Sequence, residues 1–165
     1  MHRKVTNVLF VSTENACRSL LAEASLNHLS KGKLRAFSCG VPSKTAVKPP
    51  SWTTLALTTA SIPDTGLTCK SWAELSKPGS VRMDFVIGLD AATYASHPAW
   101  PGQAITALWD YPAVGSKNKK NLDPGIEAVQ TLLSLHGRIE FLVTLHAKGR
   151  RHSDLEHDIR DLTHV

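Results

Sequence analysis

Short apolar runs alternate with amphipathic segments along most of the chain. The stretch from Val5 to Val11 is rich in β-branched and aromatic side chains, which predicts a first strand. Similar apolar runs predict three further strands, over residues 34–39, 83–89 and 104–108. Apolar positions three or four residues apart predict helices between them, over residues 19–30, 52–60 and 90–97, and a short helical turn over 71–75.

A last long helix is predicted near the end of the chain. Asp123 and Pro124 resemble an acidic cap followed by proline in the first turn. Its predicted apolar face consists of Ile126, Val129, Leu133, Ile139 and Leu142. The segment from His146 onward is mostly charged, so we expect one domain over residues 1–165 that ends in a polar tail, 146–165.

Strands that alternate with helices imply a parallel sheet covered on both faces, which is an α/β fold with three αβα layers. Ligands of such sheets bind beyond the carboxyl ends of the strands. The 12–19 loop follows the first strand, and the 109–114 segment follows the fourth. These two segments are therefore the candidate walls of a binding site.

The first of these segments has the pattern of an anion-binding loop. An apolar strand stops at six small or polar residues, Ser12–Cys17, and a helix follows directly. Loop amides and helix-start amides then point the same way, and the helix start carries partial positive charge. Arg18 at the helix entrance adds a planar donor group that suits phosphate. The pattern predicts a site for a tetrahedral oxyanion.

Composition and charge bear on whether the chain binds nucleic acid, contacts a membrane or lies in the cytoplasm. The formal net charge is +5, but its two densest clusters, KNKK at 117–120 and KGRR at 148–151, lie in predicted loops without interleaved aromatic residues. We therefore expect no nucleic-acid partner. Since no apolar run reaches about 18 residues and the three cysteines lack metal-like spacing, we expect a cytoplasmic protein without membrane contact. The histidines show no tight ligand spacing, so neither a metal nor a cofactor is expected.

The stretch VLFVSTENACRSLLAEA, residues 8–24, strongly resembles the phosphate loop of low-molecular-weight protein tyrosine phosphatases and of the thioredoxin-coupled arsenate reductases that share their fold. The resemblance continues in SCGVPSKTAVKPPSWTTL, GLTCKSWAEL, MDFVI, HPAWPGQAITALW and YPAVGS. It covers most of residues 5–145 and fits the arsenate reductases best. It implies a four-stranded parallel sheet of flavodoxin-like winding, as in the phosphotyrosine phosphatase I fold.

The resemblance also implies roles for the loop residues. In the family, the loop amides and the arginine that matches Arg18 hold the equatorial oxygens of the oxyanion. The serine that matches Ser19 hydrogen-bonds the nucleophile, and the residue that matches Asn15 holds the shape of the loop. The implied oxyanion-binding residues are Ser12, Thr13, Glu14, Asn15, Ala16, Cys17, Arg18 and Ser19.

Two residues depart from the family pattern within the loop. Ser12 stands at the position of the nucleophilic cysteine, and an alcohol cannot be ionised by a positive loop as a thiol can. A serine nucleophile needs an adjacent general base, and the loop contains no histidine. Glu14 stands where the family has glycine, which places a negative charge beside the anion. Glu14 as a base for Ser12 is the alternative interpretation.

The expected acid and the redox cysteines also depart from the pattern. The phosphatases use an aspartate before a proline, where this chain has Tyr111; Asp110 is the nearest substitute for the acid. Tyr111 either lines the rim of the anion site or packs in the core. The reductases need two further cysteines after the third strand, and the matching stretch has none. Cys17, Cys39 and Cys69 read as packing residues, with a reactive Cys17 as the alternative.

Three hypotheses remain from the sequence. The first is a member of this superfamily that binds phosphate, sulfate or arsenate without the usual cysteine mechanism. The second is an active phosphatase or arsenate reductase, in which Ser12 is engineered or Glu14 or Asp110 compensates for it. The third is a docking module for a phosphorylated protein. The sequence leaves open both enzymatic activity and oligomeric state.

Overall fold

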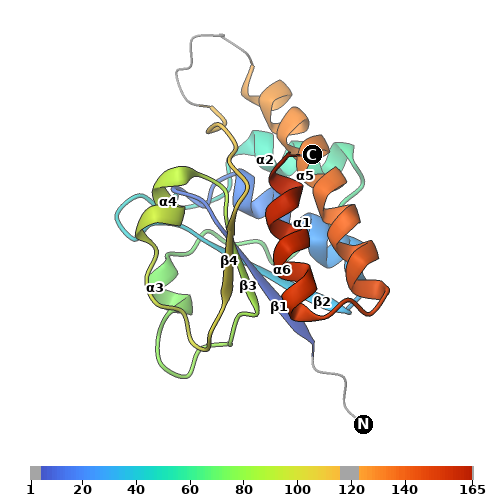
Figure 1. The fold of residues 1–165 in the computed structure, drawn as a ribbon. Helices are drawn as coiled ribbons and strands as arrows, with labels where there is room; N and C mark the ends of the chain where they lie inside the picture. Colours follow the sequence, from blue (N-terminus) through green and yellow to red (C-terminus); the bar gives the residue numbers. More distant parts are fainter. Residues whose placement is uncertain (1–4, 116–122, 165) are drawn as a thin grey trace.

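A computed structural model describes residues 5–115 and 123–164, without the side chain of His164. Its centre is a sheet of four parallel strands in the order β2-β1-β3-β4 (Figure 1). The strands are β1 (Thr6–Val11), β2 (Leu34–Cys39), β3 (Phe85–Gly88) and β4 (Ile105–Leu108). This confirms the α/β fold class and the flavodoxin-like strand order.

Helices cover both faces of the sheet, as the alternation of strands and helices predicts (Figure 1). The helices are α1 (Arg18–Ser30), α2 (Ser51–Thr59), α3 (Trp72–Leu75), α4 (Ala91–Ser96), α5 (Pro124–Ala147) and α6 (His152–Asp161), followed by the 3₁₀ turn η1 (Leu162–His164). Among the described residues, no helix is both long and apolar enough to cross a membrane.

The side chains of β1 alternate between two separate apolar clusters. Val8 and Phe10 belong to the large cluster that packs against α1, α2, α5 and α6. Leu9 and Val11 belong to a smaller cluster with Met83 on the other face. Because all four β1 side chains are buried, the strand reads as a continuous apolar run, which is typical of a central parallel strand.

The predicted apolar face of α5 is wrong in part. Ile126 is 52% exposed and Leu133 is 67% exposed. The buried face follows spacings of four and three residues, through Ala128, Leu132, Leu135, Ile139 and Leu142. The helix is therefore turned relative to the predicted face, and two apolar side chains point to solvent.

Much of the predicted polar tail, 146–165, folds into α6. Leu155 and Ile159 are fully buried although charged residues surround them in the sequence. The indole Nε1 of Trp109 donates a hydrogen bond of 2.8 Å to the carbonyl of Ile159, which fixes α6 against the end of β4. The KNKK cluster, 117–120, lies outside the described residues.

Candidate functional site

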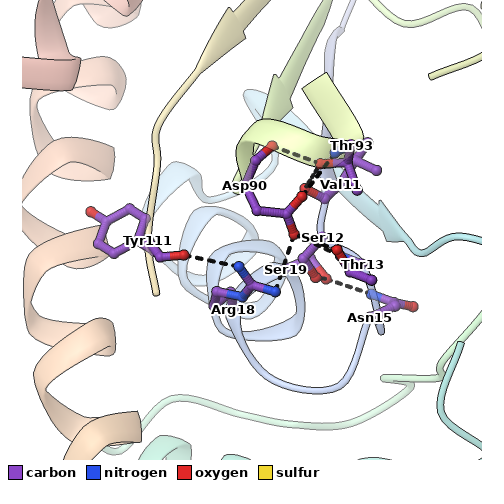
Figure 2. Close-up of polar contacts among 9 residues, drawn as sticks. All are labelled: Val11, Ser12, Thr13, Asn15, Arg18, Ser19, Asp90, Thr93 and Tyr111. Atoms are coloured by element: carbon purple, nitrogen blue, oxygen red, sulfur yellow. Dashed lines mark hydrogen bonds and ion pairs between the residues drawn. The ribbon is translucent and has the colours of Figure 1, made fainter. Parts of the chain in front are cut away.

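The 12–17 loop joins the carboxyl end of β1 to the start of α1. In the strand order β2-β1-β3-β4, the direction of winding reverses between β1 and β3, and ligand sites of such sheets lie at this switch point. The residue that follows β3 at this edge, after Leu89, is Asp90. The structure brings Asp90 into direct contact with the loop, as described below (Figure 2).

The carbonyl groups of the loop are engaged by neighbouring segments. Thr13 and Glu14 accept hydrogen bonds of 2.9 Å from the amides of Val41 and Ala46. Ala16 accepts one from the Thr53 hydroxyl. In contrast, none of the amides from residue 14 to residue 18 donates a hydrogen bond within the described part of the chain. A run of unpartnered amides at a helix start favours a bound anion.

Asn15 fixes the conformation of the loop. Its backbone lies in the left-handed region with φ of 48°, which asparagine tolerates better than most residues. Its Oδ1 accepts a hydrogen bond of 2.8 Å from the amide of Lys70. Its Nδ2 lies 2.7 Å from Ser19 Oγ and 3.0 Å from Ser38 Oγ. The side chain is completely buried, so these bonds are shielded from water.

The hydrogen bonds of this network have a defined direction at Ser12. Ser19 Oγ accepts from Asn15 Nδ2 and lies 2.6 Å from Ser12 Oγ. Ser38 also accepts from Asn15 and donates to the Glu23 carboxylate. Because no other acceptor contacts the Ser19 hydroxyl among the described residues, its proton points to Ser12 Oγ. Ser12 therefore receives a hydrogen bond from the network, and the network supplies no base to it.

Arg18 is held between the ends of two other strands. Its Nη1 donates a hydrogen bond of 2.9 Å to the carbonyl of Tyr111, after β4 (Figure 2). Its Nη2 lies 3.1 Å from Asp90 Oδ2, after β3. The Arg18 side chain is only 8% exposed, so both contacts fix the guanidinium at the base of the site.

Asp90 is the residue that sequence reasoning missed. Its Oδ2 accepts hydrogen bonds from the Thr13 amide at 2.9 Å and the Thr13 hydroxyl at 2.8 Å. Its Oδ1 accepts one from the Thr93 amide, which caps α4. Burial acts to raise the pKa of Asp90, but these hydrogen bonds and the Arg18 charge outweigh burial and hold the pKa below its usual value. The carboxylate is thus ionised beside the loop.

A cavity of about 300 Å³ opens over the loop. Four types of group meet there: the hydroxyl of Ser12, the carboxylate of Glu14, the charge of Arg18 and an apolar rim. The residues that line the cavity are Ser12, Glu14, Ala16, Cys17, Arg18, Ala46, Pro50, Trp52, Ala113, Val114 and Gly115. Glu14 is exposed at this cavity, and nothing within the described residues links its carboxylate to Ser12.

Two predicted residues of the 109–114 segment do not take the expected positions. Asp110 is exposed and does not line the cavity, so the structure does not place the expected acid there. The Tyr111 ring points away from the loop, and its hydroxyl lies 2.9 Å from Ser134 Oγ on α5 (Figure 2). Its ring also lies 4.8 Å from the Arg138 guanidinium. The rim interpretation is therefore wrong for this side chain, although its carbonyl contacts Arg18.

The cysteines have the environment of packing residues. Burial raises the pKa of Cys17 to about 11, although a hydrogen bond with Thr53 and the Arg18 charge act in the opposite direction. Burial likewise raises the pKa of Cys39 to about 12 and raises the pKa of Cys69. A reactive cysteine needs a lowered pKa, which none of these three has. Within the described residues, no three histidine, cysteine or acidic side chains are grouped to hold a metal ion.

The strand order and the loop at its switch point define a protein of the flavodoxin-like α/β class. A family model described as low molecular weight phosphotyrosine protein phosphatase matches residues 7–134. Because this match covers well over half of the chain, the chain belongs to the low-molecular-weight phosphotyrosine protein phosphatase family. A search of curated proteins gave no match.

Solved structures of the same fold include both phosphatases and arsenate reductases. A thioredoxin-dependent arsenate reductase from Corynebacterium glutamicum is 19% identical, with a TM-score of 0.65, and the match covers 91% of this chain and 66% of that one. An arsenate reductase in a phosphate-binding state is 21% identical, with a TM-score of 0.64 over 85% of this chain and 98% of that one. A low-molecular-weight protein tyrosine phosphatase from T. tengcongensis is 22% identical, with a TM-score of 0.59 over 84% and 98%.

Proposed function

We propose that this chain binds a phosphate-like oxyanion in the Ser12–Ser19 loop without the thiolate chemistry of a cysteine nucleophile. The observation that carries the proposal is the run of amides from residue 14 to residue 18, which have no partner in the described part of the chain and lie beside a cavity that Ser12 and Arg18 also line. Amide donors at a helix start favour a tetrahedral anion such as phosphate, sulfate or arsenate. An arsenate reductase of this fold has been solved in a phosphate-binding state, which supports anion binding.

Arg18 has donors left for such an anion. A guanidinium carries five N–H donors, and the contacts with Tyr111 and Asp90 engage one on each terminal nitrogen. Both contacts also fix its plane, so little side-chain entropy is lost when an anion binds. Asp90 and Glu14 oppose binding, because each places a carboxylate near the anion. We therefore expect weak to moderate affinity rather than tight binding.

The absence of thiolate chemistry follows from the environment of Ser12. An alcohol needs a neighbouring base to become a nucleophile. Ser12 Oγ receives a hydrogen bond from Ser19 instead of donating its proton to a base. An exposed Asp110 away from the cavity offers no acid for a leaving group. The raised pKa values of the three cysteines give no support to a thiol relay.

Calorimetric titration with inorganic phosphate tests the binding proposal. We expect the parent chain to bind phosphate and Arg18→Ala to bind it at least about tenfold more weakly, since a charged donor pair is removed. Arg35→Ala is the matched control, because Arg35 is an exposed arginine on β2, and its affinity should equal that of the parent. Equal affinity of Arg18→Ala and the parent, or no phosphate binding by the parent, contradicts the proposal.

Hydrolysis of para-nitrophenyl phosphate separates the binding proposal from an active phosphatase. We expect no turnover by the parent chain, and slow turnover by Ser12→Cys, because Ser19 and the amides then act on a thiol that can ionise. Turnover by the parent that is lost in Ser12→Ala would show that Ser12 acts as a nucleophile. That result would replace the binding role by the phosphatase hypothesis.

A further inference from the structure

A second cavity lies at the amino end of the sheet, away from the 12–19 loop. It has a volume of about 600 Å³ and is bordered by the start of β1, the turn before β2 and the connection from α5 to α6. The lining residues are Val5, Gly32, Lys33, His146, Ala147, Lys148, Gly149, Arg150 and His152. The volume lies within the range of small-molecule sites.

Every ionisable side chain that lines this cavity is basic. Among residues 5–115 and 123–164, Lys33 and Lys148 take part in no ion pair. Arg150 is paired with Asp158 through two contacts of 3.0 Å, so its charge is largely compensated. Two lysines and two histidines therefore line one space, and no carboxylate residue is among the described residues that line it.

The pKa of His146 is affected by the positive charges around it. Its Nε2 lies 3.2 Å from Thr6 Oγ1, which fixes the ring at the start of β1. Burial lowers the pKa of His146, and the nearby His152 and Lys33 lower it further by repulsion. A like-charge cluster of this kind is stabilised when an anion binds within it.

We propose that this basic cavity binds a small anion with two or more negative charges, of the diphosphate class, independently of the 12–19 loop. Lys33 and Lys148 supply the charged donors to its oxygens, and the glycines at 32 and 149 leave room for its approach. The volume, larger than the 300 Å³ of the cavity over the loop, favours more than one phosphoryl group.

Binding at this site becomes stronger as the pH falls. His146 is faced by Lys33 and His152, and His152 is faced by His146 and by Asp84, whose Oδ1 lies 3.9 Å from its Nδ1. Protonation of His146 adds positive charge beside the bound anion, while Asp84, near His152, offsets part of it. The anion in turn raises the pKa of His146, by linkage.

Calorimetric titration of pyrophosphate into Arg18→Ala tests this site apart from the loop. We expect Arg18→Ala to retain pyrophosphate binding and Arg18→Ala/Lys33→Ala/Lys148→Ala to lose about tenfold or more in affinity. The matched control, Arg18→Ala/Lys48→Ala/Lys77→Ala, removes two exposed lysines elsewhere and should bind as Arg18→Ala does. NMR titration should show an upward pKa shift of His146 when pyrophosphate is bound.

Three results would overturn the inference. They are an absence of pyrophosphate binding to Arg18→Ala, equal loss of affinity in the two lysine variants, and a His146 pKa that does not move on binding. A failure of phosphate binding at the loop does not affect this test. Arg18→Ala and both of its lysine variants already lack the Arg18 side chain, so pyrophosphate affinity and the His146 pKa are compared without it.

Discussion

At the scale of single residues, Asn15 links the backbone of the loop to two other segments. It combines a left-handed backbone with side-chain hydrogen bonds to Ser19, Ser38 and the Lys70 amide. Because the side chain is completely buried, its removal leaves three partners without replacement by water. The loop conformation and the orientation of Ser19 therefore depend on the same side chain.

Two replacements of Asn15 separate the contribution of its side-chain hydrogen bonds from that of its left-handed backbone. We expect Asn15→Ala to lower the free energy of unfolding by about 2–4 kcal/mol, through the unsatisfied partners and the strained φ. Asn15→Gly loses the same hydrogen bonds but tolerates the positive φ, so it should be less destabilising by roughly 1 kcal/mol. Urea unfolding at equilibrium measures both. A stability of Asn15→Ala equal to the parent contradicts this account.

The sequence predicts the loop residues far better than it predicts their partners. Ser12, Asn15, Arg18 and Ser19 lie in one contiguous motif, so resemblance and local pattern identify them together. The contact between Thr13 and Asp90 joins residues 77 positions apart, and only the parallel pairing of β1 with β3 brings them together. A polar residue directly after a buried strand, at the same sheet edge as the loop, was the available signal.

At the scale of secondary-structure elements, the strands were predictable and the last two helices were less so. Strands buried on both faces show as apolar runs, and β2 has the predicted bounds, 34–39. The buried face of α5 depends on which of several apolar positions meet the neighbouring helices α1 and α2, which local periodicity leaves open. In α6 only Leu155 and Ile159 are buried within a charged segment, so the packing against β4 decides its position.

Truncation of the buried face of α6 tests its contribution to stability. Ile159→Ala removes a side chain that is 1% exposed, so we expect a loss of about 2–4 kcal/mol in the free energy of unfolding. Leu133→Ala on α5 is the control, since Leu133 is 67% exposed and should change stability by less than about 0.5 kcal/mol. Equal losses measured by urea unfolding would show that α6 does not pack as described.

At the scale of the whole molecule, the two faces of the sheet are unequally covered. One face packs against α1, α2, α5 and α6 through the large cluster that contains Phe10, Trp109 and Leu135. The other face carries the short helices α3 and α4 over a smaller cluster that contains Leu9 and Trp100. Local opening costs less free energy where fewer apolar side chains are buried.

Native-state hydrogen exchange should therefore give lower opening free energies on the face that carries α3 and α4 than on the face that carries α5. We expect the amides of α3 and α4 to exchange through local opening at low denaturant, whereas those within 132–142 of α5 require global unfolding. NMR-detected exchange at increasing denaturant concentration measures this difference. Equal opening free energies for α4 and α5 would mean that both faces unfold as one unit.

The Asp90 carboxylate connects the loop to a helix on the less covered face of the sheet. Its Oδ1 caps α4 on the thinly covered face, while its Oδ2 contacts Thr13 and Arg18 at the loop. A shift of Arg18 or Thr13 away from Oδ2 therefore removes contacts that hold the carboxylate where it caps the first turn of α4. Asp90 therefore couples the loop to α4. We expect anion binding in the loop to change the hydrogen-exchange rates of the amides of α4.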